Sequence, residues 1–165
     1  MTTRAPRSGE RQGRDYRFIS LATFQQLRRS GRLLEWARVH NAYYGTPKRP
    51  VVRALTEGKS VILSIDVQGA RQVRHALGKR VVLIFLLPPS MASLRQRLLR
   101  RRTETPAAIR RRLAAAKREL RCAAWYDHRV VNDRLIQAVN DVQAIVRARQ
   151  ERSTGDGPAA VGASR

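Results

Sequence analysis

Two apolar runs, SVILSID at residues 60–66 and RVVLIFLLPP at residues 80–89, most constrain how this chain can fold. Both are continuous rather than alternating, which is typical of strands buried on both faces of a parallel sheet. The segment between them places Ala70, Val73 and Leu77 on one side of a helix that ends at Gly78. The pattern therefore predicts a strand–helix–strand unit with a right-handed crossover, and an α/β fold.

Further helices are predicted at residues 20–31, 49–58, 105–120 and 135–150, and a short strand at residues 128–133. The helix at residues 105–120 should begin at Thr105-Pro106, because proline suits the first turn of a helix. Residues 151–165 are rich in Gly, Ala and Ser without apolar periodicity, so we expect a disordered tail there.

The chain is strongly basic. Its 34 Lys and Arg residues face 12 Asp and Glu residues, a formal charge of +22, so nucleotides, nucleic acid and acidic membranes are the first partners to consider. The longest apolar run, residues 81–87, is far shorter than the ~20 residues of a membrane-spanning helix. Without a hydrophobic leader in the first twenty residues, we expect a cytoplasmic protein. One cysteine and three scattered histidines predict no metal ligands.

The stretch LLEWARVHNAYYGTP combines an isolated carboxylate with aromatic and hydroxyl groups. An ionised Glu35 could accept the N1–H and the exocyclic amine of guanine together, and the Thr46 hydroxyl could donate to O6. Adenine would turn a lone pair toward the same carboxylate, so this pair of groups would select guanine. From this stretch alone, an ordinary surface acid and a Tyr43-Tyr44 packing pair explain the pattern equally well.

The opening residues suit a phosphate. Arg4 and Arg7 stand beside a Gly-Glu turn and are followed by Tyr16. Guanidinium groups and a phenol hydroxyl bind a phosphate monoester well. In so arginine-rich a chain, most arginines simply face solvent.

Eight arginines lie between residues 95 and 112, against one acid, Glu104. Charge repulsion at this density predicts a segment that stays mobile until an anion binds. It could be a lid that closes on a triphosphate, a patch for nucleic acid, or a solvated helix face.

Several stretches now fall in one order: TTRAPRSGE, DYRF, LEWA, YYGT, ILSIDVQGA, FLLPPS, RRTET with RRRLAAA, and VVND. Over residues 2 to 150 the chain closely resembles guanylate kinase. The resemblance implies a P-loop NTPase-like parallel sheet, a GMP-binding lobe at residues 1–50, a core at residues 51–150 and an arginine-rich lid at residues 93–112. It also implies transfer of the γ-phosphoryl of ATP to GMP, with Mg²⁺.

The resemblance assigns roles position by position. It implies phosphate contacts to GMP from Arg4, Arg7, Tyr16 and Tyr44, and guanine contacts from Glu35, Thr46 and Asp66. Arg101 and Arg112 would contact the ATP phosphates and the transferring group, and Asn132 would lie near the lid.

The chain departs from the family pattern in two ways. The family pattern opens with an apolar strand, a glycine-rich phosphate loop that ends in Gly-Lys-Ser/Thr, and a helix, and none of these is found in this sequence. The ATP-binding loop and the central strand of the sheet are therefore missing. Without that strand the neighbouring strands would be left ~10 Å apart, with unpaired edges. We therefore expect a misplaced start or a broken gene. Ser64 also replaces the first acid of the family's Asp-Ile-Asp, which would weaken Mg²⁺ handling.

Two other functions compete with a complete kinase. A guanylate-kinase-like module that binds GMP or a protein without catalysis fits the missing loop and Ser64. A basic RNA-associated protein fits the charge but explains none of the ordered motifs, so nucleic acid is not favoured.

Overall fold

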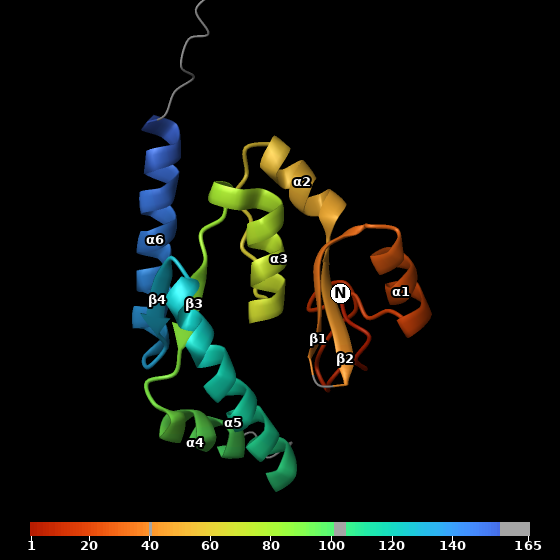
Figure 1. Ribbon diagram of the computed structural model, residues 1–165, viewed down its shortest axis with the longest axis vertical. Coiled ribbons are helices and arrows are strands. Elements are labelled where there is room, and N and C mark those ends of the chain that lie inside the picture. Colours follow the sequence, from red (N-terminus) through yellow and green to blue (C-terminus); the bar gives the residue numbers. More distant parts are fainter. Residues whose placement is uncertain (40, 101–104, 156–165) are drawn as a thin grey trace, which may run out of the picture. The chain divides into compact units, whose positions relative to one another are not determined.

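The computed structural model describes residues 1–39, 41–100 and 105–155. The chain divides into two compact units, Met1–Val81 and Val82–Arg165, and each is described by itself (Figure 1). In the described part of the chain, no helix is both long and apolar enough to span a bilayer.

The first unit is built on a β-hairpin. Helix α1 (Leu21–Arg29) precedes strands β1 (Leu33–Val39) and β2 (Ala42–Pro47), which pair antiparallel, and α2 (Lys48–Thr56) and α3 (Val67–Leu77) follow. The first residues add to the hairpin, because Thr2 bridges Tyr44 and also Phe18. Side chains cap two of the helices: Ser20 Oγ accepts from the N–H of Thr23, and Asp66 Oδ1 from that of Gly69.

The core of this unit lies where β1, α2 and α3 meet, around Leu34, Val51 and Val73. Residues 60–66, predicted as a strand buried on both faces, form no strand. Val61, Leu63 and Ile65 pack against the core, whereas Ile62 is 78% exposed. The prediction fails because no described backbone segment pairs with residues 60–66, and a strand needs a ladder partner. The apolar run is nonetheless extended and covers the core with one face.

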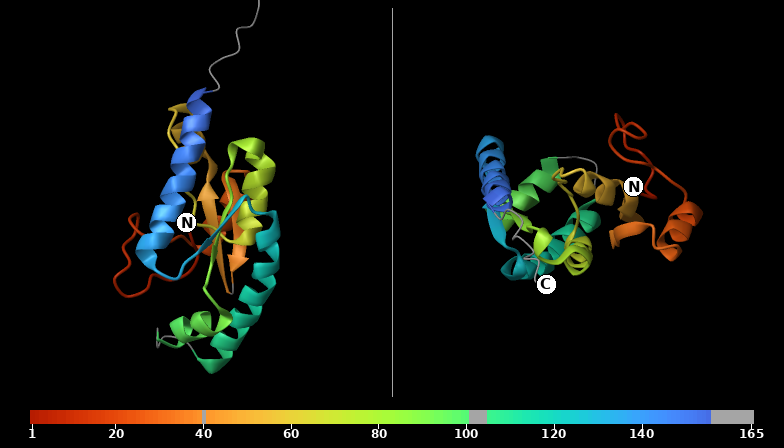
Figure 2. Two further views of the ribbon diagram at one scale, coloured as in Figure 1. Left: turned by 90° about the vertical axis from the view of Figure 1, so that its left-hand side faces the viewer. Right: turned by 90° about the horizontal axis from the view of Figure 1, so that it is seen from above.

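The second unit contains a two-stranded parallel sheet, labelled in Figure 1, and ends in a long helix that Figure 2 shows in blue from two further sides. Its elements are β3 (Ile84–Leu87), α4 (Met91–Arg100), α5 (Pro106–Leu120), a 3₁₀ turn at Arg121–Trp125, β4 (His128–Val131) and α6 (Leu135–Gly155). Strand β3 pairs with β4 from Ile84 opposite His128 to Leu87 opposite Val131. Asp127 holds the start of this pairing, because its carboxylate accepts the N–H of Leu83 at 2.7 Å.

The helices of this unit differ from expectation in two places. Residues 91–100 form α4, a helix that was not predicted from the sequence and that overlaps the stretch at residues 93–112 expected to be a lid. Helix α6 continues to Gly155, past the predicted start of the tail at residue 151. Residues 101–104 and 156–165 lie outside the described residues. The expected start of α5 is confirmed, since Thr105 caps it and Pro106 opens it.

Candidate functional site

A pocket of about 270 Å³ lies on the hairpin of the first unit. Five of the predicted site residues line it: Tyr16, Glu35, Tyr44, Thr46 and Asp66. The remainder of its wall is formed by Met1, Ala37, Val39, Gly45, Ser64 and Ile65. Its size approaches the ~300 Å³ at which small-molecule pockets begin. The fold thus gathers residues that are up to 50 positions apart in the sequence, from Tyr16 to Asp66.

Glu35 is the buried carboxylate of this pocket. It lies opposite Thr46 in the hairpin register, and Thr46 Oγ1 donates to Glu35 Oε1 at 2.6 Å. Only 3% of Glu35 is exposed. Burial raises the pKa of Glu35, and the nearby Asp66 carboxylate adds to the rise, while the hydrogen bond from Thr46 opposes it. The result is a buried carboxylate that Thr46 orients in the wall of the pocket.

The expected bond from the Thr46 hydroxyl to O6 of guanine stays a prediction, and in the structure this hydroxyl contacts Glu35. The hydroxyl donates to the Glu35 carboxylate, whereas the sequence predicted that it would donate to O6 of guanine. A hydroxyl donates one hydrogen only, so donation to O6 would require rotation away from Glu35. In this arrangement Thr46 orients the carboxylate.

Asp66 brings a second carboxylate to the pocket. It is the N-cap of α3, and its Oδ1 accepts the N–H of Gly69 at 2.9 Å. The Gln68 side chain donates to its other oxygen at 3.2 Å. Ser64, two residues earlier, also lines the pocket. The helix cap therefore fixes the direction of the Asp66 carboxylate.

The predicted phosphate end is held by a network around Arg4. Its Nε donates to the Tyr44 hydroxyl at 3.2 Å, and its two terminal nitrogens each donate to Glu10 at 2.9 Å. The guanidinium carbon lies 5.6 Å from the centre of the Tyr16 ring. Arg4, Tyr16 and Tyr44 are thus brought together, and Arg4 is oriented by a forked ion pair.

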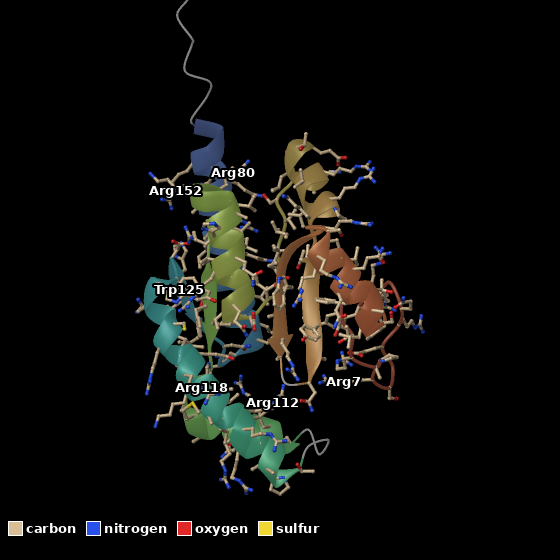
Figure 3. All side chains as sticks on the ribbon, turned by 45° about the vertical axis from the view of Figure 1, so that its right-hand side comes forward. Arg7, Arg80, Arg112, Arg118, Trp125 and Arg152 are labelled. Carbon is tan, nitrogen blue, oxygen red and sulfur yellow. The ribbon has the colours of Figure 1, made fainter. Side chains whose placement is uncertain are left out.

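Arg7 is exposed on the N-terminal loop (Figure 3). Its backbone N–H donates to Glu10 Oε2 at 2.7 Å. Arg4 and this N–H together lower the pKa of Glu10 to about 2. Glu10 therefore stays ionised across the physiological range and closes the loop that carries Arg7.

Three residues that contact the site were given no role from the sequence: Glu10, Gly69 and Gln72. Glu10 stands in the quoted Gly-Glu turn, but nothing local shows that its partner is Arg4. A glycine inside a helical pattern is a usable signal, because it costs ~1 kcal/mol against alanine and usually has a packing reason. Gln72 gives no local signal, since its contacts are with the distant residue Trp36.

The other predicted residues belong to the second unit or lie outside the described residues. Asn132 follows β4, and its N–H donates to the carbonyl of Leu87 at 2.7 Å, while its own carbonyl accepts from Arg97 at 2.8 Å. Arg112 is half-buried on α5. Arg101 is outside the described residues. The roles of these three residues stay predictions.

The described residues contain no strand, loop and helix of the P-loop kind. The tripeptide Gly58-Lys59-Ser60 has the closing residues of that loop, but it follows α2 and precedes an extended segment. Arg53 stands where the first glycine of the loop motif would be. This tripeptide therefore lacks both the spacing and the setting of a phosphate loop.

Comparisons with known proteins agree on one family. The family model described as guanylate kinase matches residues 1–149. A guanylate kinase of Gloeobacter violaceus is 50% identical over 145 residues, which cover 88% of this chain and 70% of that protein. One from Thermus thermophilus is 48% identical over 153 residues, covering 93% and 69%. The crystal structure of guanylate kinase from Anaplasma phagocytophilum superposes with a TM-score of 0.79 at 34% identity, covering 90% of this chain and 72% of that one.

Proposed function

Because the chain belongs to the guanylate kinase family, we propose that the pocket on its β1–β2 hairpin binds GMP. The guanine base would contact Glu35 and Asp66, and the phosphate would contact Arg4, Tyr16 and Tyr44. Enzymes of this family transfer the γ-phosphoryl of ATP to GMP, giving ADP and GDP. The proposal assigns the acceptor half of that reaction to the first unit.

The observation that carries the proposal is the oriented carboxylate of Glu35. Guanine offers two N–H donors side by side, and a carboxylate held at one oxygen by Thr46 can accept both of them. Adenine has no N–H at N1 and would leave the buried carboxylate without a partner there. Since an unmatched buried charge is costly, the same geometry disfavours AMP.

The phosphate end supports the proposal through charge. The forked pair with Glu10 holds Arg4 in one direction, so little side-chain freedom remains to be lost when a phosphate binds. Arg7 is exposed on the same loop and would add a second guanidinium. A phosphate dianion would then be held by two cations and two phenol groups.

The donor half of the reaction requires ATP, a metal ion and cationic side chains near the transferring group. Mg²⁺ is expected to arrive with the ATP phosphates, because it usually takes only one or two protein carboxylates. Within residues 1–39, 41–100 and 105–152 no three His, Cys, Asp or Glu side chains gather, and Ser64 offers no carboxylate. Arg101 and Arg112 are proposed to stabilise charge on the transferring phosphoryl group.

Calorimetric titration of the chain with GMP and with AMP tests the binding site. We expect saturable GMP binding and much weaker AMP binding. Equal affinity for the two nucleotides would contradict the proposed reading of the base. A parallel assay for GDP formation from ATP, GMP and Mg²⁺ tests transfer.

GMP binding without any GDP formation would favour a second candidate, a module that binds GMP but does not catalyse. The presence of Ser64 at the position of the family's first acid is the observation that favours this candidate. A Ser64→Asp variant that gains transfer activity would show that this position limits the reaction.

A further inference from the structure

The close approach of Glu35 to helix α3 depends on a glycine. A Cβ atom at Gly69 would lie 2.5 Å from Glu35 Oε2 and 3.1 Å from its Cδ. Real Cβ atoms essentially never come so near an oxygen. Gly69 does not have a positive φ angle, so its backbone would accept any residue. The Glu35 carboxylate therefore occupies the space that a Cβ at position 69 would need, and one of the two would have to shift.

The same glycine also holds the second carboxylate. Its N–H donates to Asp66 Oδ1 at 2.9 Å. Gly69 thus contacts Glu35 with its open Cα face and Asp66 with its amide. Both carboxylates therefore lie beside this one backbone position.

One helical turn further on, Gln72 fastens α3 to β1. Its side-chain amide donates to the carbonyl of Trp36 at 2.7 Å, and its side-chain oxygen accepts the N–H of Trp36 at 3.1 Å. This two-bond pairing imitates a neighbouring strand. Trp36 directly follows Glu35, so the pairing fixes the backbone from which the Glu35 side chain extends.

We propose that Gly69 and Gln72 are positioning residues that set the Glu35 and Asp66 carboxylates for the reading of guanine. The inference rests on the proposed function, in that guanine is the base being read. Gln72 holds β1 at a fixed distance from α3, and Gly69 leaves the space into which Oε2 fits. Neither residue touches the ligand.

The two residues lie on the face of α3 that meets β1, and Ala76 on the same helix is exposed. This gives a matched control, because Ala76→Gly weakens α3 by helix propensity alone. The test variants are Gly69→Ala, which fills the space, and Gln72→Met, which keeps the length of the side chain and removes both hydrogen bonds to Trp36, together with a longer one to the carbonyl of Gln68. Each is titrated with GMP and with IMP, whose base lacks the exocyclic amine.

We expect Gly69→Ala and Gln72→Met to weaken GMP binding by roughly tenfold to a hundredfold, as a displaced contact group does. IMP binding should weaken less, so the preference for GMP over IMP should fall. Ala76→Gly should keep the preference of the unmodified chain. If both test variants keep that preference, the inference is wrong. Should Gly69→Ala fail to fold, Gln72→Met decides the matter alone.

A stability cycle separates this inference from the proposed function. Glu35→Asp shortens the side chain by one methylene and vacates the space beside position 69. Gly69→Ala should therefore lower the urea midpoint of the unmodified chain, but in the Glu35→Asp background it should raise the midpoint slightly, because alanine favours the helix by ~1 kcal/mol over glycine. An equal fall of the urea midpoint in both backgrounds would show that the contact between position 69 and Glu35 is not the cause of the lost stability. A chain that fails to bind GMP but shows this coupling would refute the proposed function and leave the packing of Glu35 on Gly69 standing.

Discussion

Replacing Glu35 with glutamine should weaken GMP binding and at the same time stabilise the unliganded protein. In the proposed complex the carboxylate accepts two N–H groups from guanine, and glutamine can accept only one while turning its own N–H toward the second. Losing a charged hydrogen bond costs ~1.5–3 kcal/mol, and leaving a donor unmatched costs about as much again. The expected loss is thus about 3–6 kcal/mol, roughly a hundredfold to ten-thousandfold in Kd.

The stability of the unliganded protein should move in the opposite direction. Burial raises the pKa of Glu35 above its ordinary value of 4.5, so the folded state binds a proton more tightly than the unfolded state. The stabilisation linked to that proton is fully present below pH 4.5 and is lost as the pH rises through the raised pKa. Glutamine carries no charge at any pH. Glu35→Gln should therefore be more stable than the unmodified chain at neutral pH, by a margin that shrinks on acidification.

Calorimetry with GMP and urea unfolding at neutral and acidic pH measure both effects. The matched control is Glu57→Gln, because Glu57 is a partly exposed acid whose pKa is lowered by Lys59 and Arg53. This control should bind GMP normally and should not gain stability at neutral pH. Unchanged GMP affinity in Glu35→Gln would refute the role of the carboxylate. A loss of stability at neutral pH would refute the account of its burial.

Two further substitutions test the frame of the site. Glu10→Gln removes the charge that orients Arg4. Because the pKa of Glu10 is lowered to about 2, the ion pair stabilises the folded loop above the ordinary pKa of a glutamate, and this stabilisation is lost as the pH falls toward 2. Hydrogen exchange at neutral pH should therefore show faster exchange in residues 4–19 of the variant, and unchanged protection would contradict the orienting role. Phe24→Ala should cost about 3–5 kcal/mol of unfolding free energy, because the ring is 1% exposed. Leu21→Ala on the same helix, 49% exposed, should cost far less in the same urea titration, and equal losses would place the core elsewhere.

The family and five of the residues that line the pocket could be read from the sequence, because the motifs are ordered and each assigns a residue by position. Helix starts were also readable, since a cap is made by residues three positions apart. Thr105 caps α5 through the N–H of Ala108. Such contacts are local, so both partners can be recognised within one short segment of the sequence.

The sequence by itself determined the family and predicted which side chains would bind the substrates, whereas the tertiary structure decided how those side chains are held. Nothing near Glu35 indicates that Thr46 donates to it or that Gly69 makes room for it, because these contacts depend on hairpin register and on where α3 lies. The run at residues 60–66 illustrates the same limit: burial on both faces was predicted, but only one face packs on the core and Ile62 is 78% exposed, because a strand exists only if another segment pairs with it. Composition and periodicity are properties of one segment, whereas ladders, ion pairs and close approaches are properties of two. Only the folded chain brings the second segment into place.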